Sequence, residues 1–259
     1  MTPRMVILAA GEGKRLRPLT EDRPKCLLEV SGKSLIDWQI EAATRLGLGE
    51  VAVVTGYKAD RFQQQGCRWY HNPDYADTNM VETLWCAKEE LQGETIISYG
   101  DIIYEDSVLE AVVASEAPIS VVVDLEWRSY WDRRFADPLS DAESLRLNEK
   151  GCIEEIGQKP EAIAEIQGQY IGLMKFGGVG ISTLQEVYQG LESGEITGRS
   201  ARPLRKMYMT DLLQAIVDAG YQVHAVPVHR GWLEIDSPSD YQLAIKHVQS
   251  GLNGLRILI

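Results

Sequence analysis

Short apolar runs alternate with stretches of helical spacing along the first half of the chain. Four of the runs have the length and the β-branched composition of strands buried on both faces of a sheet. They are Met5–Ala10, Val51–Thr55, Thr95–Tyr99 and Ile119–Val123. Helical spacing covers three stretches between them, Leu35–Leu46, Met80–Leu91 and Ser107–Ala114. This alternation predicts an α/β fold with a mostly parallel sheet flanked by helices.

The pattern changes after Asp124. A polar stretch with several aromatic residues, Glu126–Glu143, precedes short apolar pieces that favour hairpins at Leu145–Ile156 and Gly168–Phe176. Helical and strand-like segments then return at Thr183–Leu191, Thr210–Ala219, Gln222–Val228 and Trp232–Asp236, and a last helix is expected to start near Pro238. No repeat or low-complexity linker divides the chain, so we expect a single domain over residues 1–259 with an insert at approximately 124–180.

The chain carries 26 basic and 38 acidic residues, a net charge of −12. This charge argues against nucleic acid as a partner, because proteins that bind the phosphate backbone present a basic face. The four cysteines form no metal or redox motif, and the sequence shows no secretion signal and no apolar run of membrane-spanning length. We therefore expect a cytoplasmic protein with reduced thiols and no membrane partner.

Positive charge gathers in the segment Ala9–Lys25, directly after the first strand. Ligands of open parallel sheets bind beyond the carboxyl ends of the strands, so a ligand is expected here. Two glycines, Gly11 and Gly13, let backbone N–H groups approach an anion. The segment is neither a Walker A motif nor a full dinucleotide fingerprint, because Leu16 stands where a third glycine belongs. The basic side chains suited to a triphosphate are Lys14, Arg15 and Lys25.

This segment resembles the nucleotidyltransferase superfamily that activates sugar phosphates, choline phosphate and phosphonates. The motif of that superfamily is G-x-G-x-R-x-x-P-x-T followed by P-K, and every element is present between Gly11 and Lys25. The resemblance implies a Rossmann-like mixed sheet, with Lys14 and Arg15 on the β- and γ-phosphates of an NTP and Lys25 on the α-phosphate. The nucleotide-binding residues that it implies are Ala9, Ala10, Gly11, Glu12, Gly13, Asn79 and Gly100.

Two carboxylates lie at the ends of predicted strands, and Asp101 is expected at the same sheet edge as the phosphate loop. Asp101 comes after Thr95–Tyr99, and Asp236 ends the last strand-like segment. Mg²⁺ is typically held by one or two carboxylates together with substrate phosphates. The resemblance implies that both residues bind Mg²⁺, which would be the cofactor. For Asp236 an alternative is open, because it could instead start the helix at Ser237-Pro238.

The expected chemistry needs no general base. An acceptor phosphate is already anionic at neutral pH, so catalysis reduces to aligning two anions and screening their charge. Lys25 and Mg²⁺ would stabilise the transition state at the α-phosphorus, and pyrophosphate would leave on the side of Lys14 and Arg15.

The segments expected to bind the acceptor lie in and after the insert. The stretch Asp124–Arg134 combines aromatic rings with carboxylates, a combination that recognises ammonium groups. Its rings could equally form a small core of the insert. The resemblance also implies Lys159 as a ligand of the acceptor phosphate, although Lys159 could be a surface lysine on a hairpin. The acceptor-binding residues expected are Asp124, Trp131, Lys159 and Gly172.

The stretch Thr78–Leu84 partly matches the choline-phosphate cytidylyltransferase branch, although Asn79 could serve only to cap a helix. The branch predicts transfer of CMP from CTP to an acceptor such as choline phosphate or aminoethylphosphonate. A sugar-1-phosphate nucleotidyltransferase using UTP, GTP or dTTP is the main alternative. A glycosyltransferase is disfavoured because no Asp-x-Asp triplet occurs, and an inactive nucleotide sensor because the motif is complete. The exact acceptor, the pathway and the oligomeric state, including a homodimer, are left open.

Overall fold

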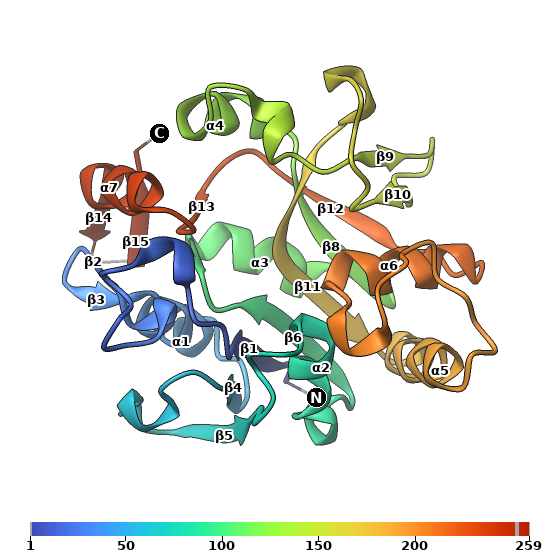
Figure 1. Ribbon diagram of the computed structural model, residues 1–259, viewed down its shortest axis with the longest axis horizontal. Helices are drawn as coiled ribbons and strands as arrows, with labels where there is room; N and C mark the ends of the chain where they lie inside the picture. Colours follow the sequence, from blue (N-terminus) through green and yellow to red (C-terminus); the bar gives the residue numbers. More distant parts are fainter. Residues whose placement is uncertain (1, 252–253, 259) are drawn as a thin grey trace.

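The computed structural model describes residues 2–251 and 254–258. Its centre is a seven-stranded sheet of order β12-β8-β11-β6-β1-β4-β5 (Figure 1). β11 runs antiparallel to both of its neighbours, whereas the other pairings in this sheet are parallel. The expected mixed, mostly parallel sheet is thereby confirmed. Its strands are β1 (Arg4–Ala9), β4 (Val51–Thr55), β5 (Cys67–His71), β6 (Glu94–Tyr99), β8 (Ile119–Asp124), β11 (Gln169–Gly177) and β12 (His224–Val228).

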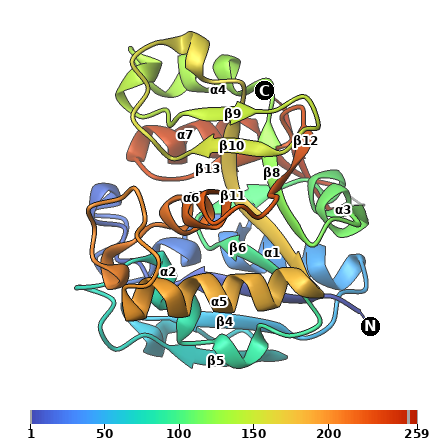
Figure 2. The ribbon, with the colours of Figure 1, turned by 90° about the vertical axis from the view of Figure 1, so that its right-hand side faces the viewer.

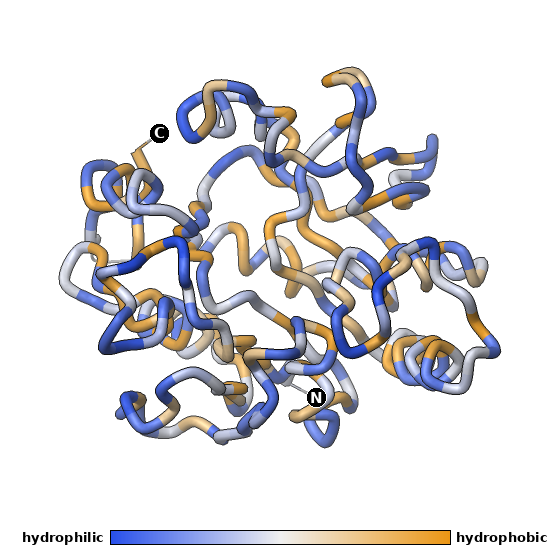
Figure 3. Tube along the Cα trace, in the orientation of Figure 1, coloured by the Kyte–Doolittle hydropathy of each residue, from blue (hydrophilic) through white to orange (hydrophobic). Residues whose placement is uncertain are grey.

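Helices cover both faces of the sheet. On β1, Met5 and Ile7 face the apolar core shared with α1 and α3, and Val6 and Leu8 face the core shared with α2, α5 and α6. Each such side chain contributes about 1.5–3 kcal/mol when fully buried, which explains the continuous apolar runs of the sequence. Apolar residues accordingly follow the central strands in Figure 3. The helices are α1 (Leu35–Arg45), α2 (Met80–Trp85), α3 (Asp106–Ala114), α4 (Trp127–Arg134), α5 (Val179–Ser193), α6 (Met209–Asp218) and α7 (Pro238–His247).

One predicted helix is shorter than its sequence pattern. Helical spacing extends to Leu91, but α2 ends at Trp85 and a short 3₁₀ turn follows. Within that turn the buried Glu90 accepts hydrogen bonds from Arg4 at 3.0 Å and from Tyr70 at 2.7 Å. These long-range contacts hold the segment against the strands and override its local helical preference.

The segment Gly168–Phe176 was expected to form a short hairpin, and this prediction is wrong. It belongs to β11, which lies between β6 and β8 in the centre of the sheet. Gly172 adopts φ +84°, and the register between β11 and β8 shifts between Tyr170 and Met174. A glycine in a strand often marks such an irregularity, and Gly172 lies at the bulge of β11. The part of the expected insert that lies outside the main sheet is therefore 125–168.

Four two-stranded sheets complete the described structure. The predicted hairpin at Leu145–Ile156 is present as β9 and β10, which lie with α4 beyond one end of the main sheet (Figure 2). None of the described helices is long and apolar enough to cross a membrane. The strands are β2 (Glu29–Val30) with β3 (Lys33–Ser34), β7 (Ile102–Tyr104) with β13 (Trp232–Glu234), β9 (Leu145–Leu147) with β10 (Ile153–Ile156), and β14 (Val248–Gly251) with β15 (Gly254–Ile257).

A buried arginine fastens α4 to the rest of the molecule. The guanidinium of Arg134 donates to Glu234 at 2.9 Å and to Asp240 at 2.9 Å, and its side chain is 1% exposed. It also lies over the rings of Tyr130 and Trp131, each at 5.2 Å from the centroid. Arg134 thus joins the insert to the end of β13 and to the first turn of α7.

Replacing Arg134 by Met should lower the free energy of unfolding by about 3–5 kcal/mol, because it leaves two largely buried carboxylates without their partner. Arg128→Met on the same helix is the matched control. Arg128 pairs with Asp132 at the surface, so its loss should cost about 0.5 kcal/mol or less. Urea unfolding followed by tryptophan fluorescence measures both. Equal losses in the two variants would contradict the role assigned to Arg134.

Candidate active site

A pocket of about 370 Å³ opens at the carboxyl ends of β1 and β6. The loop after β1, the turn after β6 and the start of α2 form its walls. All of the residues that the sequence predicted for the nucleotide lie along it. They are Ala9, Ala10, Gly11, Glu12, Gly13, Asn79 and Gly100.

The loop after β1 depends on one glycine for its conformation. Gly13 has φ +62°, and a Cβ at this position would lie 2.9 Å from the Cβ of Lys25. Any other residue would therefore be strained by both its backbone and its contacts. The hydroxyl of Thr20 donates to the Gly13 carbonyl at 2.8 Å, which closes the loop on itself. No atom lies within 4 Å of a Cβ built on Gly11, so the backbone there borders open space.

The cations of the loop are paired with carboxylates of the chain itself. Lys14 contacts Glu12 at 3.0 Å, and Arg15 contacts Asp236 at 2.7 Å, with both basic side chains about two-thirds exposed. The ammonium of Lys25 is nearly buried and donates to Asp101 and, at 2.6 Å, to Asp236. Lys25 thus lies at the centre of the charged groups, and Lys14 and Arg15 lie at the solvent-exposed rim.

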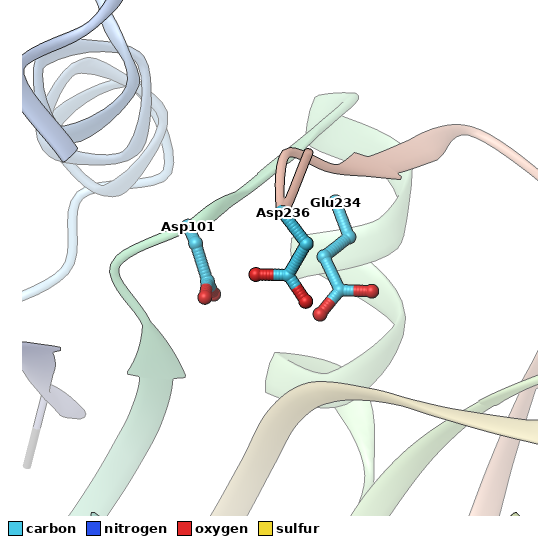
Figure 4. A group of neighbouring side chains, drawn as sticks. All are labelled: Asp101, Glu234 and Asp236. Carbon is cyan, nitrogen blue, oxygen red and sulfur yellow. The ribbon is translucent and has the colours of Figure 1, made fainter. Parts of the chain in front are cut away.

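Three carboxylates meet beside Lys25. Asp101, Glu234 and Asp236 each offer an oxygen, and these oxygens lie within 4.8 Å of one another. The Asp236 carboxyl lies between the other two (Figure 4). Oδ1 of Asp101 is buried and accepts no hydrogen bond from the described residues. A set of carboxylate oxygens with one unused buried oxygen has the chemistry to hold a hard divalent cation.

Burial and charge act in opposite directions on these groups. Burial alone would lower the pKa of Lys25, but the carboxylates of Asp101 and Asp236 outweigh it and raise that pKa. Burial would raise the pKa of Asp236, but Lys25 and Arg15 hold it well below its ordinary value. For Glu234, burial and the charge of Asp236 raise the pKa well above its ordinary value, and Arg134 opposes this only in part.

Two tertiary contacts bring the carboxylates together. In the ladder of β7 and β13, Glu234 pairs with Ile102, and the N–H of Ile235 donates to the Asp101 carbonyl at 3.0 Å. The buried amide of Gln39 on α1 donates to the carbonyls of Tyr99 and Ile102, at 2.9 and 2.7 Å. Gln39 therefore fixes the turn that carries Asp101.

The side chain of Asp236 does not cap the helix that follows it, which was the alternative to metal binding. Ser237 is the N-cap of α7, and its hydroxyl accepts the N–H of Asp240 at 3.2 Å. Asp240 in turn accepts the backbone N–H of Ser237 at 2.9 Å, so the capping box is complete without Asp236. The Asp236 carboxylate is directed toward Lys25 and Arg15. Asn79 is the N-cap of α2, but its amide donates to the Lys206 carbonyl and does not cap the helix.

A second pocket of about 340 Å³ adjoins the first and shares Arg15, Met80, Tyr99 and Asp236 with it. It lies between β11, the insert and α6. Two of the predicted acceptor residues, Trp131 and Gly172, line it. At Gly172 a Cβ would lie 2.7 Å from the ring of Tyr99, so only glycine allows β11 to approach that ring.

Two predicted acceptor residues lie elsewhere, and these expectations are corrected. Asp124 is fully buried and accepts hydrogen bonds from Trp232 Nε1 at 2.9 Å and from the backbone N–H of Arg230 at 3.1 Å. Its carboxylate is thereby committed to packing β8 against β13. Lys159 donates to the Leu139 carbonyl and borders a different, open surface pocket.

The aromatic residues of the insert divide between core and pocket. Trp127, Tyr130 and Trp131 are all buried in one apolar cluster, and the guanidinium groups of Arg134 and Arg230 already lie over the Tyr130 ring. Trp127 and Tyr130 therefore belong to the core, which was the alternative to a role in acceptor binding. Trp131 belongs to the same cluster and also borders the second pocket.

Several residues of the site were not predicted from the sequence. Glu234 alternates with Asp236 across Ile235, and this spacing of two along a strand was the available signal for a shared face. Asp141 and Glu143 line the second pocket, but they lie in an irregular polar stretch that gave no such signal. Gln39 looked like an ordinary helix residue because its partners are 59 or more positions away.

Comparisons with known proteins agree with this geometry. The profile of the MobA-like NTP transferase domain matches residues 5–156. A CTP:phosphoglutamine cytidylyltransferase of Campylobacter jejuni is 38% identical over 252 residues, which are 93% of this chain and 98% of that protein. A choline-phosphate cytidylyltransferase of Streptococcus pneumoniae is 37% identical over 105 residues, which are 39% of this chain and 46% of that protein. A UTP–glucose-1-phosphate uridylyltransferase of Haloferax volcanii is more distant, at 27% identity over 164 residues, which are 60% of this chain and 65% of that protein.

The solved structure of the CTP:phosphocholine cytidylyltransferase of Streptococcus pneumoniae superposes with a TM-score of 0.73. The superposition covers 95% of this chain and 99% of that chain at 20% identity. It therefore supports a shared fold. The profile match extends over more than half of the chain, and the Campylobacter jejuni relative extends over nearly all of it. The chain therefore belongs to the family of MobA-like NTP transferases.

Proposed function

We propose that this protein transfers CMP from CTP to a small phosphorylated acceptor, releases pyrophosphate and uses Mg²⁺. The observation that carries the proposal is the position of Lys25, Asp101 and Asp236. All three line the first pocket, and Asp236, which pairs with Lys25, also lines the second pocket. A nucleotide in the first pocket and an acceptor in the second would meet there. The full-length similarity to a CTP-dependent enzyme supports cytidine as the base.

Asp101 and Asp236 are the proposed Mg²⁺ ligands, with Glu234 beside them. Their oxygens are the ligand type that Mg²⁺ prefers, and the unused Oδ1 of Asp101 fits such a role. When bound, Mg²⁺ would supply positive charge against the phosphate oxygens of CTP.

The basic side chains of the loop have different proposed roles in catalysis. Lys25 is directed at the junction of the pockets, where its ammonium would stabilise the charge that develops on the α-phosphate. Lys14 and Arg15 at the rim would hold the pyrophosphate portion as it leaves. The attacking oxygen belongs to an acceptor phosphate that is already anionic, so no side chain has to remove a proton. Alignment of the two anions is therefore the main task of the site.

The proposed acceptor is a small phosphate or phosphonate that carries an amine, such as choline phosphate, aminoethylphosphonate or phosphoglutamine. The second pocket supports this class, because its described lining holds four acidic residues and a single basic one. Asp124 and Lys159 have no part in this proposal. A single domain and a cytoplasmic location stay predictions from the sequence, and the oligomeric state stays open.

Replacing Lys25 by Ala should lower kcat by about 10²–10³-fold or more, because a cation directed at transition-state charge is worth at least that much. Pyrophosphate release from CTP in the presence of the acceptor measures the effect, and circular dichroism checks the fold. Lys33→Ala, at an exposed lysine paired with Glu41, is the control and should keep wild-type activity. A folded Lys25→Ala protein that retains a tenth of the activity would show that the assigned role is wrong.

Asp101→Asn and Asp236→Asn should each abolish activity at millimolar Mg²⁺, because neutral amides are poor ligands for a hard cation. Mn²⁺ should restore part of it. Isothermal titration of the EDTA-treated proteins with Mg²⁺ and CTP should show weakened metal binding in both variants. Asp132→Asn, on the exposed face of α4, serves as the control. Full activity of Asp236→Asn after Mg²⁺ is restored would remove Asp236 from the proposed metal site.

The base and the acceptor are tested together by comparing kcat/KM across substrates. CTP and UTP are each combined with choline phosphate, aminoethylphosphonate, phosphoglutamine and glucose-1-phosphate. CTP with one of the amine-bearing acceptors should give the highest value. A clear preference for UTP with glucose-1-phosphate would overturn the proposed substrates and favour a sugar-1-phosphate nucleotidyltransferase.

A further inference from the structure

Two carboxylates of the second pocket differ from its other acidic residues in their ion pairing. Asp141 and Glu143 both line the pocket, and neither forms an ion pair within 4.0 Å in the described part of the chain. By contrast, the other two acidic residues of that lining are paired, Glu234 with Arg134 and Asp236 with Lys25 and Arg15. Both residues are partly buried, where an unpaired carboxylate is disfavoured, so their position calls for an explanation.

The surroundings of these carboxylates oppose their ionisation. Burial raises the pKa of Glu143 to about 7, with Asp211 and Asp141 adding to the rise and Arg202 and Thr210 opposing it. Burial likewise raises the pKa of Asp141, although Arg134 lowers it and Asp236 raises it further. A cation bound in the pocket would favour the ionised form of both groups.

A buried tryptophan beside Asp141 gives an independent sign of a ligand. Trp131 is only 4% exposed and borders the same pocket, and its Nε1 has no hydrogen-bond partner among the described residues. The indole N–H lies near the Asp141 carboxyl, and this interaction lowers the pKa of Asp141 against the effect of burial. A buried polar atom without a hydrogen-bond partner is uncommon, and it indicates that a ligand binds beside it.

The position of Glu143 is fixed by the central sheet. Its N–H donates to the side chain of Gln169 at 3.2 Å, and the Gln169 amide donates back to the Glu143 carbonyl at 2.6 Å. Gln169 is the first residue of β11, the strand that forms the floor of the pocket. The backbone of Glu143 is therefore tied to a strand of the central sheet, which supports the position of a group that sets specificity.

We propose that Glu143, together with Asp141, binds the ammonium group of the acceptor and sets the preference of the enzyme for amine-bearing acceptors. This inference rests on the proposed function. The second pocket shares Arg15 and Asp236 with the first pocket, and Asp141 and Glu143 are also part of its lining. An acceptor would place its phosphate beside the shared residues, next to the nucleotide, and its ammonium against Asp141 and Glu143, with Trp131 beside it.

The test compares acceptors that differ only in the ammonium group. Aminoethylphosphonate is paired with propylphosphonate, choline phosphate with 3,3-dimethylbutyl phosphate, and phosphoglutamine with its analogue lacking the α-amino group, each with CTP. The wild-type enzyme should prefer the charged member of its best pair by about 10–100-fold in kcat/KM, from a charge-assisted hydrogen bond for a primary ammonium and from ionic and cation–π contact for the trimethylammonium of choline. Glu143→Gln should remove most of that preference by raising KM for the charged acceptor. KM for CTP and the rate with the uncharged acceptor should stay unchanged.

Glu149→Gln, at an exposed carboxylate in the turn between β9 and β10, is the matched control and should keep the preference. Asp141→Asn should remove part of it. If Glu143→Gln does not fold, Glu143→Asp and Asp141→Asn provide the same comparison. An undiminished preference in the folded variants would overturn this inference and leave the proposed function intact. A wild-type enzyme that uses glucose-1-phosphate and none of the amine acceptors would overturn both.

Discussion

The ionic contact of Lys25 with Asp101 and Asp236 is the interaction on which the site depends. It joins three segments that are far apart in the sequence: the loop after β1, the turn after β6 and the end of β13. Such a contact is costly to bury and more costly to break from one side, because an unpaired charge would then remain. The ammonium keeps two acidic groups close together without a metal ion. The two pockets meet at this contact, so the geometry that places Lys25 also places the proposed reaction.

A second ionic contact links this centre to the insert. Arg134 on α4 binds Glu234, which neighbours Asp236, and its guanidinium lies over the ring of Trp131. One buried side chain therefore connects Trp131 in the wall of the second pocket with Glu234, which lies beside Asp101 and Asp236. The insert is held by charge as well as by apolar packing, which ties the position of Trp131 to that of Glu234. This explains how a segment outside the main sheet can have a fixed position relative to the site.

The two pockets differ in charge, although the chain as a whole is strongly acidic. The basic residues of the first pocket are Lys14, Arg15 and Lys25, in a loop whose backbone N–H groups also favour anions. The second pocket has an excess of carboxylates, of which Glu143 and Asp141 are unpaired. Opposite charges in adjoining pockets would orient an acceptor that is anionic at one end and cationic at the other. The net charge of −12 therefore conceals a local separation that only the folded chain displays.

The sequence by itself determined the phosphate loop, the strand-end position of Asp101 and most of the sheet. These features are local, because the motif from Gly11 to Lys25 is contiguous and a buried strand is recognised by its own apolar run. Only the tertiary structure decided that Glu143 faces the second pocket, that Asp124 is used up in the core and that Gly168–Phe176 is a central strand. Each of these outcomes depends on partners tens of residues away. Local periodicity reports which face of an element is apolar, but it carries no record of which distant element will cover that face.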